Sequence, residues 1–248
     1  IGLEVHAELQ TKSKMFCDCF VEDIKMSIKE VYTSGTLGDT YIAILKFRGF
    51  YGNSPLRVYH KTTYKKWIPK IKEIYSLMPQ YEIEFVDERP KDVEEISPTN
   101  RSIERDYFPV WILDNMKPAV DESDYIVIQP HSGKENGGNT KLMSIDTVAD
   151  MVDFWKSKGL VTVILGTDES YKNFGTTNLI GQTSIIDTIS IIRDATFFVG
   201  PEGLLSFIAL SQKVYSYIFY NSYTAVEHRI IDTPWEDYCK LSKEMKFV

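Results

Sequence analysis

The residues between Asp124 and Lys141 could together hold a phosphate group. The segment begins with a short apolar run, which predicts a buried strand, and continues through a loop that contains Ser132 and Gly133. Ser144 then provides a suitable N-cap for a helix. A strand, a glycine-containing turn and a helix N-terminus form a common phosphate site, because free backbone N–H groups and the helix dipole both favour an anion. Lys141 would add a positive charge. The alternative is an ordinary loop between a strand and a helix.

Other polar loops have the same setting. Those at 34–39, 166–170, 181–184 and 200–203 each follow a predicted strand or precede a predicted helix. In an open parallel sheet such loops gather at the carboxyl edge, where ligands bind. Neither G-x-G-x-x-G nor the P-loop pattern G-x-x-x-x-G-K-[ST] occurs in the chain, so no nucleotide fingerprint singles out one of them.

The elements that must position these loops alternate between strand and helix. This order predicts an α/β fold with parallel sheets and right-handed crossovers. We expect a reduced N-terminal domain at 26–120 and a second domain at 121–248, joined by a linker near 118–124. Residues 87–105 read as an exposed loop, and 235–245 as a terminal helix. The predicted strands are 30–33, 56–60, 81–86, 125–128, 160–165, 178–180, 195–199 and 214–219.

Composition narrows the class of protein. A chain of 248 residues, 43% hydrophobic, can bury one large core or two small ones. A net charge of −7 argues against a nucleic-acid binder that works by bulk charge. Cys17, Cys19 and Cys239 form no disulfide framework, which favours a reducing, cytoplasmic compartment. No Asp-x-Asp pair occurs, so the sequence lacks the metal-dependent transferase pattern and we expect neither metal nor cofactor.

The first 19 residues, IGLEVHAELQTKSKMFCDC, differ in character from the rest of the chain. They resemble the N-terminus of the B subunit of aspartyl/glutamyl-tRNA amidotransferase. In that family the residues matching Glu4 and His6 help to hold a metal, but these two cannot complete a metal shell alone. We expect residues 1–25 to be a leader foreign to the fold, and Met26 to be a natural start.

The segment from Lys29 to Tyr220 resembles glycosyltransferase family nine, the heptosyltransferase family. The motifs that carry the resemblance are Thr33-Ser-Gly-Thr-Leu-Gly-Asp39, Gln129-Pro-His-Ser-Gly133, Lys141, Leu165-Gly-Thr-Asp-Glu169 and Val199-Gly-Pro-Glu-Gly203. The resemblance implies two Rossmann-like domains facing a cleft, the GT-B architecture. Two positions depart from the family pattern: Leu204 replaces a usual glycine, and Phe207 replaces a usual histidine.

The resemblance also implies roles for single residues. Asp39 would be the general base, although an Asp after glycine also commonly caps a helix. Lys141 would stabilise the departing diphosphate, or be a solvated lysine. Glu202 would bind ribose hydroxyls, or sit at a helix N-terminus. His131 lies in the phosphate loop, where it could touch a ligand. The residues expected at the donor are Gly38, Ser132, Gly133, Lys141, Gly166, Gly200, Glu202 and Gly203.

Three functions are compatible with these patterns. The first is metal-independent, inverting transfer of a sugar from a nucleotide-sugar donor to a glycan or lipid-linked acceptor. Peripheral contact with a membrane is compatible with this function. The second is a sugar-nucleotide binder without catalysis, because the N-terminal domain is short and Phe207 departs from the pattern. The third, a tRNA amidotransferase component, rests on the leader alone.

Overall fold

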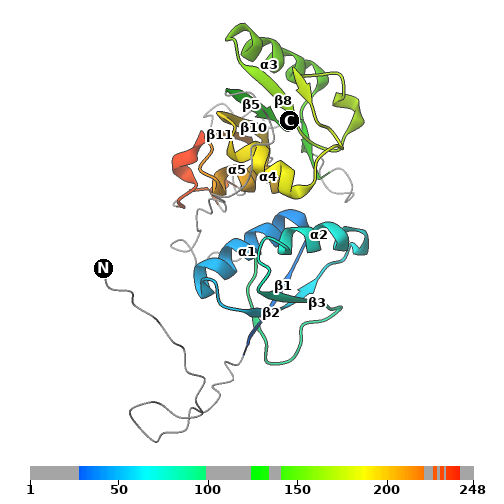
Figure 1. Ribbon diagram of the computed structural model, residues 1–248, viewed down its shortest axis with the longest axis vertical. Coiled ribbons are helices and arrows are strands. Elements are labelled where there is room, and N and C mark those ends of the chain that lie inside the picture. Colours follow the sequence, from blue (N-terminus) through cyan, green and yellow to red (C-terminus); the bar gives the residue numbers. More distant parts are fainter. Residues whose placement is uncertain are drawn as a thin grey trace, which may run out of the picture.

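The structure is a computed structural model of the 248-residue chain, and it describes residues 28–98, 124–133, 141–220, 226–227, 230–231 and 233–240. Two separate parallel sheets organise these residues (Figure 1). One sheet uses residues 29–95 and the other uses residues 125–240. The α/β class and the parallel strands are therefore confirmed. All but the last residue of the predicted linker at 118–124 lies outside the described residues, so the domain limits stay a prediction.

The N-terminal sheet has four strands in the order β3-β2-β1-β4. All of its strand pairs are parallel, and two helices follow β1 and β2 as crossovers. A short 3-10 turn at Lys65–Trp67 leads into the second helix. The elements are β1 (Lys29–Ser34), α1 (Leu37–Tyr51), β2 (Leu56–Lys61), α2 (Ile68–Tyr75), β3 (Tyr81–Phe85) and β4 (Glu94–Glu95).

The C-terminal sheet has six strands in the order β12-β11-β10-β5-β8-β9, again all parallel. A small antiparallel pair, β6 (His131–Ser132) and β7 (Lys141–Leu142), stands beside it. The remaining elements are β5 (Tyr125–Ile128), α3 (Ile145–Ser157), β8 (Val161–Ile164), β9 (Thr177–Asn178), α4 (Ile185–Arg193), β10 (Phe197–Pro201), α5 (Leu204–Ser211), β11 (Ser216–Phe219) and β12 (Cys239–Lys240).

Local sequence signals set where the helices begin. Ser144 caps α3, because its Oγ accepts a hydrogen bond from the Thr147 backbone N–H at 3.1 Å. Ser184 and Asp187 form a capping box at the start of α4, as their spacing of three residues favours. Pro69 lies in the first turn of α2, where its missing N–H costs nothing. These helix starts could all be predicted from sequence.

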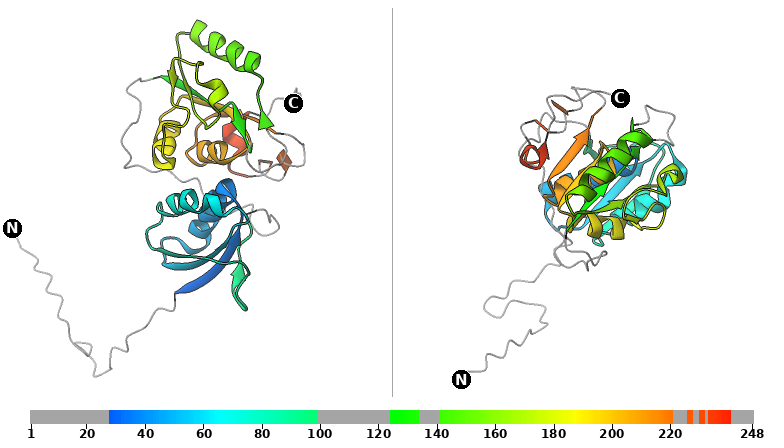
Figure 2. Two further views of the ribbon diagram at one scale, coloured as in Figure 1. Left: turned by 90° about the vertical axis from the view of Figure 1, so that its right-hand side faces the viewer. Right: turned by 90° about the horizontal axis from the view of Figure 1, so that it is seen from above.

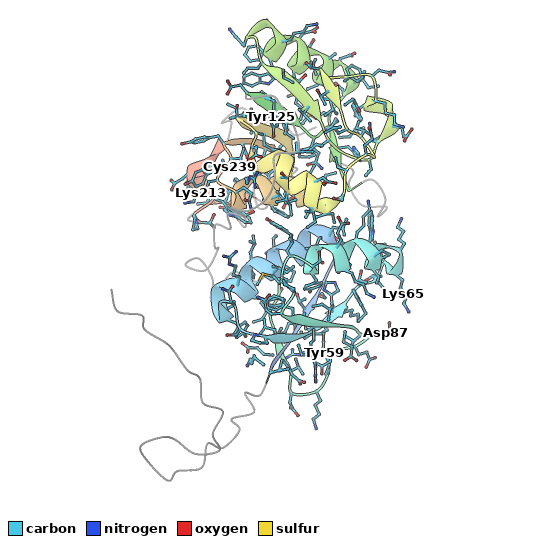
Figure 3. The ribbon with its side chains drawn as sticks, in the orientation of Figure 1. Tyr59, Lys65, Asp87, Tyr125, Lys213 and Cys239 are labelled. Atoms are coloured by element: carbon cyan, nitrogen blue, oxygen red, sulfur yellow. The ribbon has the colours of Figure 1, made fainter. Side chains whose placement is uncertain are left out.

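The two faces of the N-terminal sheet differ. Leu56, Val58 and His60 on β2 are buried against α1 and α2, while Tyr59 lies on the opposite face (Figure 3). Among the described residues, that opposite face is polar and partly exposed. Arg57 there pairs with Glu82 at 3.0 Å. The alternation along β2 therefore directs His60 toward the helices.

Helices α1 and α2 of the first sheet pack on α4 and α5 of the second (Figure 1). Helix α3 covers the outer face of the C-terminal sheet (Figure 2). One hydrophobic core contains buried residues from both sides, such as Tyr41 and Ile44 from α1 with Ile208 from α5. The Tyr41 hydroxyl lies 2.7 Å from Ser211 Oγ across this contact. The two sheets therefore share one core through their helices.

Two sequence expectations were wrong. The stretch predicted as an exposed loop contains β4, which pairs with β1 because the Ile96 N–H donates to the Tyr32 carbonyl at 2.8 Å. The segment predicted as a terminal helix begins with a 3-10 turn at Glu236–Tyr238 and continues as β12. Trp235 is nevertheless fully buried, stacked on Phe207 with ring centroids 5.8 Å apart. Its burial therefore does not need a helix.

Residues 1–25, the predicted leader, lie outside the described residues, as do Cys17 and Cys19. Within the described part of the chain, no helix has the length and apolar character needed to cross a membrane.

Candidate functional site

A cavity of about 470 Å³ lies where the first sheet's helices meet the second sheet. Its walls come from both halves of the chain, at the first residues of α1, α4 and α5 and at the loops after β5 and β8. The free N–H groups and the positive dipole end of a helix both favour an anion. At α1 and α4 carboxylates of the chain itself already accept from such groups, since Asp39 accepts from the Thr36 N–H and Glu73 from the Ile185 N–H, so the start of α5 is the end suited to a negatively charged ligand.

Asp39 lies on the cavity wall and also caps α1. The helix begins at Leu37, earlier than the sequence indicated, so Asp39 stands in its first turn. Its Oδ2 accepts hydrogen bonds from the Thr36 backbone N–H at 3.0 Å and from Thr36 Oγ1 at 3.3 Å. Asp39 Oδ1 has no hydrogen-bond partner among the described residues. One oxygen therefore holds the helix start while the other is available to a ligand.

Gly35 makes this position of Asp39 accessible. Its φ is +134°, and a Cβ there would lie 2.4 Å from Asp39 Cβ. A side chain at this position would collide with Asp39 and would strain the backbone. Residue 35 must therefore be glycine if the Asp39 carboxylate is to reach back to Thr36.

On the opposite wall, two glycines allow close approach. A Cβ on Gly203, at the start of α5, would lie 2.3 Å from Ser132 Oγ. A Cβ on Gly166 would lie 3.3 Å from His131 Cε1. Ser132, Gly133, Gly166, Glu202 and Gly203 all line the cavity, as does Gly38 on the α1 side.

Two predicted site residues stand apart from this wall. Gly200 is buried within β10, where a Cβ would lie 2.9 Å from Gln129 Cβ, so its contacts are with protein. Lys141 pairs with Ser132 in the β6–β7 ladder, which places its backbone beside the cavity. The Lys141 side chain lies outside the described structure.

His131 and Glu202 are buried polar side chains on the cavity wall. The His131 ring is stacked on Tyr171 at 6.4 Å, and its Nε2 lies 3.4 Å from Thr167 Oγ1. The Glu202 backbone N–H donates to the Phe219 carbonyl at 3.0 Å, which ties the turn before α5 to β11.

The sequence did not indicate a third set of wall residues, Trp67, Lys70 and Glu73 around α2. Their spacing of three puts them on one helix face, which was the available signal. Glu73 Oε1 accepts a hydrogen bond from the Ile185 backbone N–H at 2.6 Å, across 112 residues of sequence. A carboxylate from the first half therefore occupies the start of α4 in the second half.

Metal-ligating residues do not cluster in the described residues: no group of three His, Cys, Asp or Glu side chains could hold an ion there. His60 is buried and hydrogen-bonded to protein atoms. Cys239 is buried, and burial raises the pKa of its thiol to about 12, so it is a poor nucleophile.

Known structures share this fold. The chain is similar to the glycosyltransferase TibC from enterotoxigenic E. coli, described as iron-containing and dodecameric, with 16% identity, a TM-score of 0.56, and coverage of 88% of this chain and 64% of that one. It thus spans less than two thirds of the TibC chain.

Two further structures cover the chain more evenly. E. coli ADP-heptose LPS heptosyltransferase II has a TM-score of 0.58 at 11% identity, covering 87% of this chain and 90% of its own. A family 9 glycosyltransferase from Veillonella parvula has a TM-score of 0.56 at 8% identity, covering 86% of each. At these identities the likeness establishes a fold shared with family nine and heptosyltransferase structures, as the motifs indicated.

Sequence comparisons add one finding. Residues 1–37 match the family described as GatB/GatE catalytic domain, which confirms the resemblance of the first 19 residues and extends it through β1. No curated protein matches the chain. The match covers a small part of the sequence and does not establish a family for the whole.

Proposed function

We propose that the chain is a glycosyltransferase that moves a sugar from a nucleotide-sugar donor to an acceptor hydroxyl, without a metal ion and with inversion at the anomeric carbon. The observation that carries the proposal is the convergence of three helix N-termini and Asp39 on one cavity. Its volume of about 470 Å³ is in the range of small-molecule sites. The fold shared with family nine structures supports the same function.

The reaction needs a base and a place for the departing charge. The acceptor oxygen bonds to the anomeric carbon as its proton passes to the Asp39 carboxylate. The bond from that carbon to the diphosphate breaks, and the nucleoside diphosphate leaves with the electron pair. Preorganised N–H groups and a cation stabilise such a leaving group. In this proposal Asp39 is the base, and the start of α5 with Lys141 receives the diphosphate.

The close approach of Gly203 to Ser132 supports that placement of the diphosphate. Because Lys141 pairs with Ser132, its backbone lies on the same side of the cavity. Glu202 would contact the ribose, and Gly38, Gly133 and Gly166 would line the donor site. Lys70 adds a positive charge from α2. We further propose the GT-B arrangement, with domains at 26–120 and 121–248.

A donor panel tests the proposal. ADP-, GDP- and UDP-sugars, including ADP-heptose, are added one at a time while the melting temperature and the release of nucleoside diphosphate are measured. A donor at 100 times its dissociation constant should add about 2.7 kcal/mol of stability. Lys141→Ala should weaken donor binding and turnover together, whereas Lys91→Ala, at an exposed turn, should change neither. No thermal shift and no release with the whole panel would contradict the proposal.

A second candidate is a sugar-nucleotide binder without catalysis. Two contacts favour it. Glu73 occupies the start of α4, and Phe207 packs so closely on α1 that a Cβ on Gly38 would lie 3.2 Å from its ring. Stabilisation by a donor without any release of nucleoside diphosphate would support this candidate over the first.

A tRNA amidotransferase component stays a third prediction, because it rests on residues 1–37 alone. The acceptor class, the absence of nucleic acid among the partners and the cytoplasmic location also stay predictions.

A further inference from the structure

A line of hydrogen bonds runs from the interior of the N-terminal half to Asp39. His60, at the end of β2, has no exposed surface. Its Nδ1 lies 2.9 Å from the Tyr75 hydroxyl, and its Nε2 lies 3.3 Å from the Gly35 carbonyl oxygen. The next atoms in this line belong to the loop that precedes α1.

The directions of these bonds follow from the chemistry of the groups. A carbonyl oxygen can only accept, so His60 Nε2 must carry the hydrogen that it donates to Gly35. Burial lowers the pKa of His60, which keeps the ring neutral. Nδ1 of a neutral ring with a hydrogen on Nε2 is an acceptor, so the Tyr75 hydroxyl donates to it.

The line continues through a single peptide unit. The Gly35 carbonyl, which accepts from His60, shares its peptide group with the Thr36 N–H, which donates to Asp39 Oδ2 at 3.0 Å. Polarising a carbonyl polarises the N–H of the same peptide, so hydrogen bonds in such a series strengthen one another. The Gly35 N–H is also fixed, by the Lys61 carbonyl at 3.0 Å.

We propose that His60 is a positioning residue, which orients the Asp39 carboxylate through the Gly35–Thr36 peptide unit. With Oδ2 held from this side, Oδ1 is directed to an acceptor hydroxyl. The inference rests on the proposed function, in which Asp39 is the base. It assigns a task to a buried histidine and to Tyr75, neither of which lines the cavity.

The first experiment observes the line directly and needs no substrate. Labelling glycine with ¹³C at the carbonyl and threonine with ¹⁵N selects the three Gly–Thr pairs of the sequence, at Gly35, Gly166 and Gly175. Tyr75→Phe and His60→Leu should each shift the Thr36 amide proton resonance upfield and speed its exchange. The other two pairs serve as internal references. A Thr36 resonance that moves in neither variant would overturn the proposal.

Tyr81→Phe is a matched control for Tyr75→Phe. The Tyr81 hydroxyl is buried in the same half and has no hydrogen-bond partner among the described residues. Its removal should leave the Thr36 resonance unchanged. His60→Gln restores an N–H donor toward the Gly35 carbonyl, so it should return the resonance toward that of the original protein.

The second experiment is a double-mutant cycle on release of nucleoside diphosphate from the panel donor that binds best. His60→Leu should lower turnover about tenfold and leave donor affinity unchanged. This loss is smaller than the roughly hundredfold loss that a misplacement of about 1 Å can cause. In an Asp39→Asn background it should cause no further loss. A tenfold loss in that background as well would overturn the positioning role.

The two proposals fail in distinguishable ways. If the single variant Asp39→Asn keeps its full turnover, Asp39 is not the base, and the hydrogen bonds from His60 to Asp39 have no catalytic role. The Thr36 resonance would then report a purely structural series of bonds. A large loss in Asp39→Asn with none in His60→Leu or Tyr75→Phe would keep the base and overturn the positioning role.

Discussion

Asp39 caps a helix and also lies where the proposed reaction needs a base. Its sequence context indicated either a helix cap or a general base. The structure uses Oδ2 for the cap and leaves Oδ1 without a described partner on the cavity wall. The cap therefore does not compete with the proposed catalytic role, and it holds the carboxylate in one orientation.

Asp39→Asn separates the two roles. The asparagine carbonyl can still accept from the Thr36 N–H, so the helix start should persist. Turnover should fall roughly a hundredfold, the scale of a lost general base, while donor affinity stays largely intact. Calorimetry gives the affinity, and nucleoside diphosphate release gives the rate.

Asp187→Asn is the matched control, because Asp187 holds the corresponding position at the start of α4. Asp187 is exposed and does not line the cavity, so its variant should keep full turnover. Equal and mild losses in affinity and turnover for Asp39→Asn would show that Asp39 only caps its helix.

At the scale of elements, the loop before α1 depends on one glycine. Gly35→Ala should lower the free energy of unfolding by about 3 kcal/mol, since it strains the backbone and drives Cβ into Asp39. Gly52→Ala is the control: Gly52 also has positive φ, at +61°, but nothing lies within 4 Å of its Cβ position. Without the collision, Gly52→Ala should cost less, about 1–2 kcal/mol from its backbone conformation alone. Urea unfolding measures both, and equal losses would refute the steric argument.

The elements that sequence predicted well are those with local causes. Ser144 and Ser184 are the N-caps of α3 and α4, and apolar runs form β5 and β8. The elements that sequence missed include two edge strands of two residues each, β4 and β12. Each exists because of its neighbour in space, β1 or β11, and no local pattern encodes that pairing.

In the whole molecule, the parts of the site that depend on contacts between distant elements could not be predicted from the sequence either. The glycine loops could be predicted because each follows a strand, and the carboxyl ends of parallel strands meet at one edge. The presence of Trp67, Lys70 and Glu73 on the cavity wall could not be predicted, because it depends on how α2 packs against α4. The packing of Phe207 between Gly38 and Trp235 could likewise be seen only in the structure.

Burial of His60 should make the stability of the fold depend on pH. Its pKa is lowered by burial, partly offset by the Gly35 carbonyl and by the charge of Asp39, and Tyr75 is the other titratable group bonded to it. The unfolded chain then binds more protons below about pH 6.5, the ordinary histidine value. This stability is fully present above that pH and is lost as the pH falls toward the lower folded value.

Urea unfolding between pH 7.5 and 5 tests this, above the range where most carboxylates titrate. His60→Gln should show a smaller decline over that range than the original protein. Parallel declines in the two proteins would mean that another group causes the dependence.

The last prediction concerns the contact between the two halves. One core spans α1, α4 and α5, the Tyr41 hydroxyl reaches Ser211, and Glu73 caps α4 from the other side. Separating the halves would expose that core and leave the first N–H of α4 without its carboxylate. We therefore expect a single cooperative unfolding transition. The unfolding curve from far-ultraviolet circular dichroism should coincide with that from tryptophan fluorescence, which reports on Trp67 and Trp111 in the first half and Trp155 and Trp235 in the second.

Glu73→Ala removes the cap without touching the core. It should lower the free energy of unfolding by about 1 kcal/mol, the usual cost of a lost helix cap, and keep one transition. Glu84→Ala, at an exposed position of β3, is the control and should change stability little. Two separate transitions in the original protein would show that the halves fold independently. Equal stability of the Glu73 and Glu84 variants would show that the cap across the cavity adds nothing.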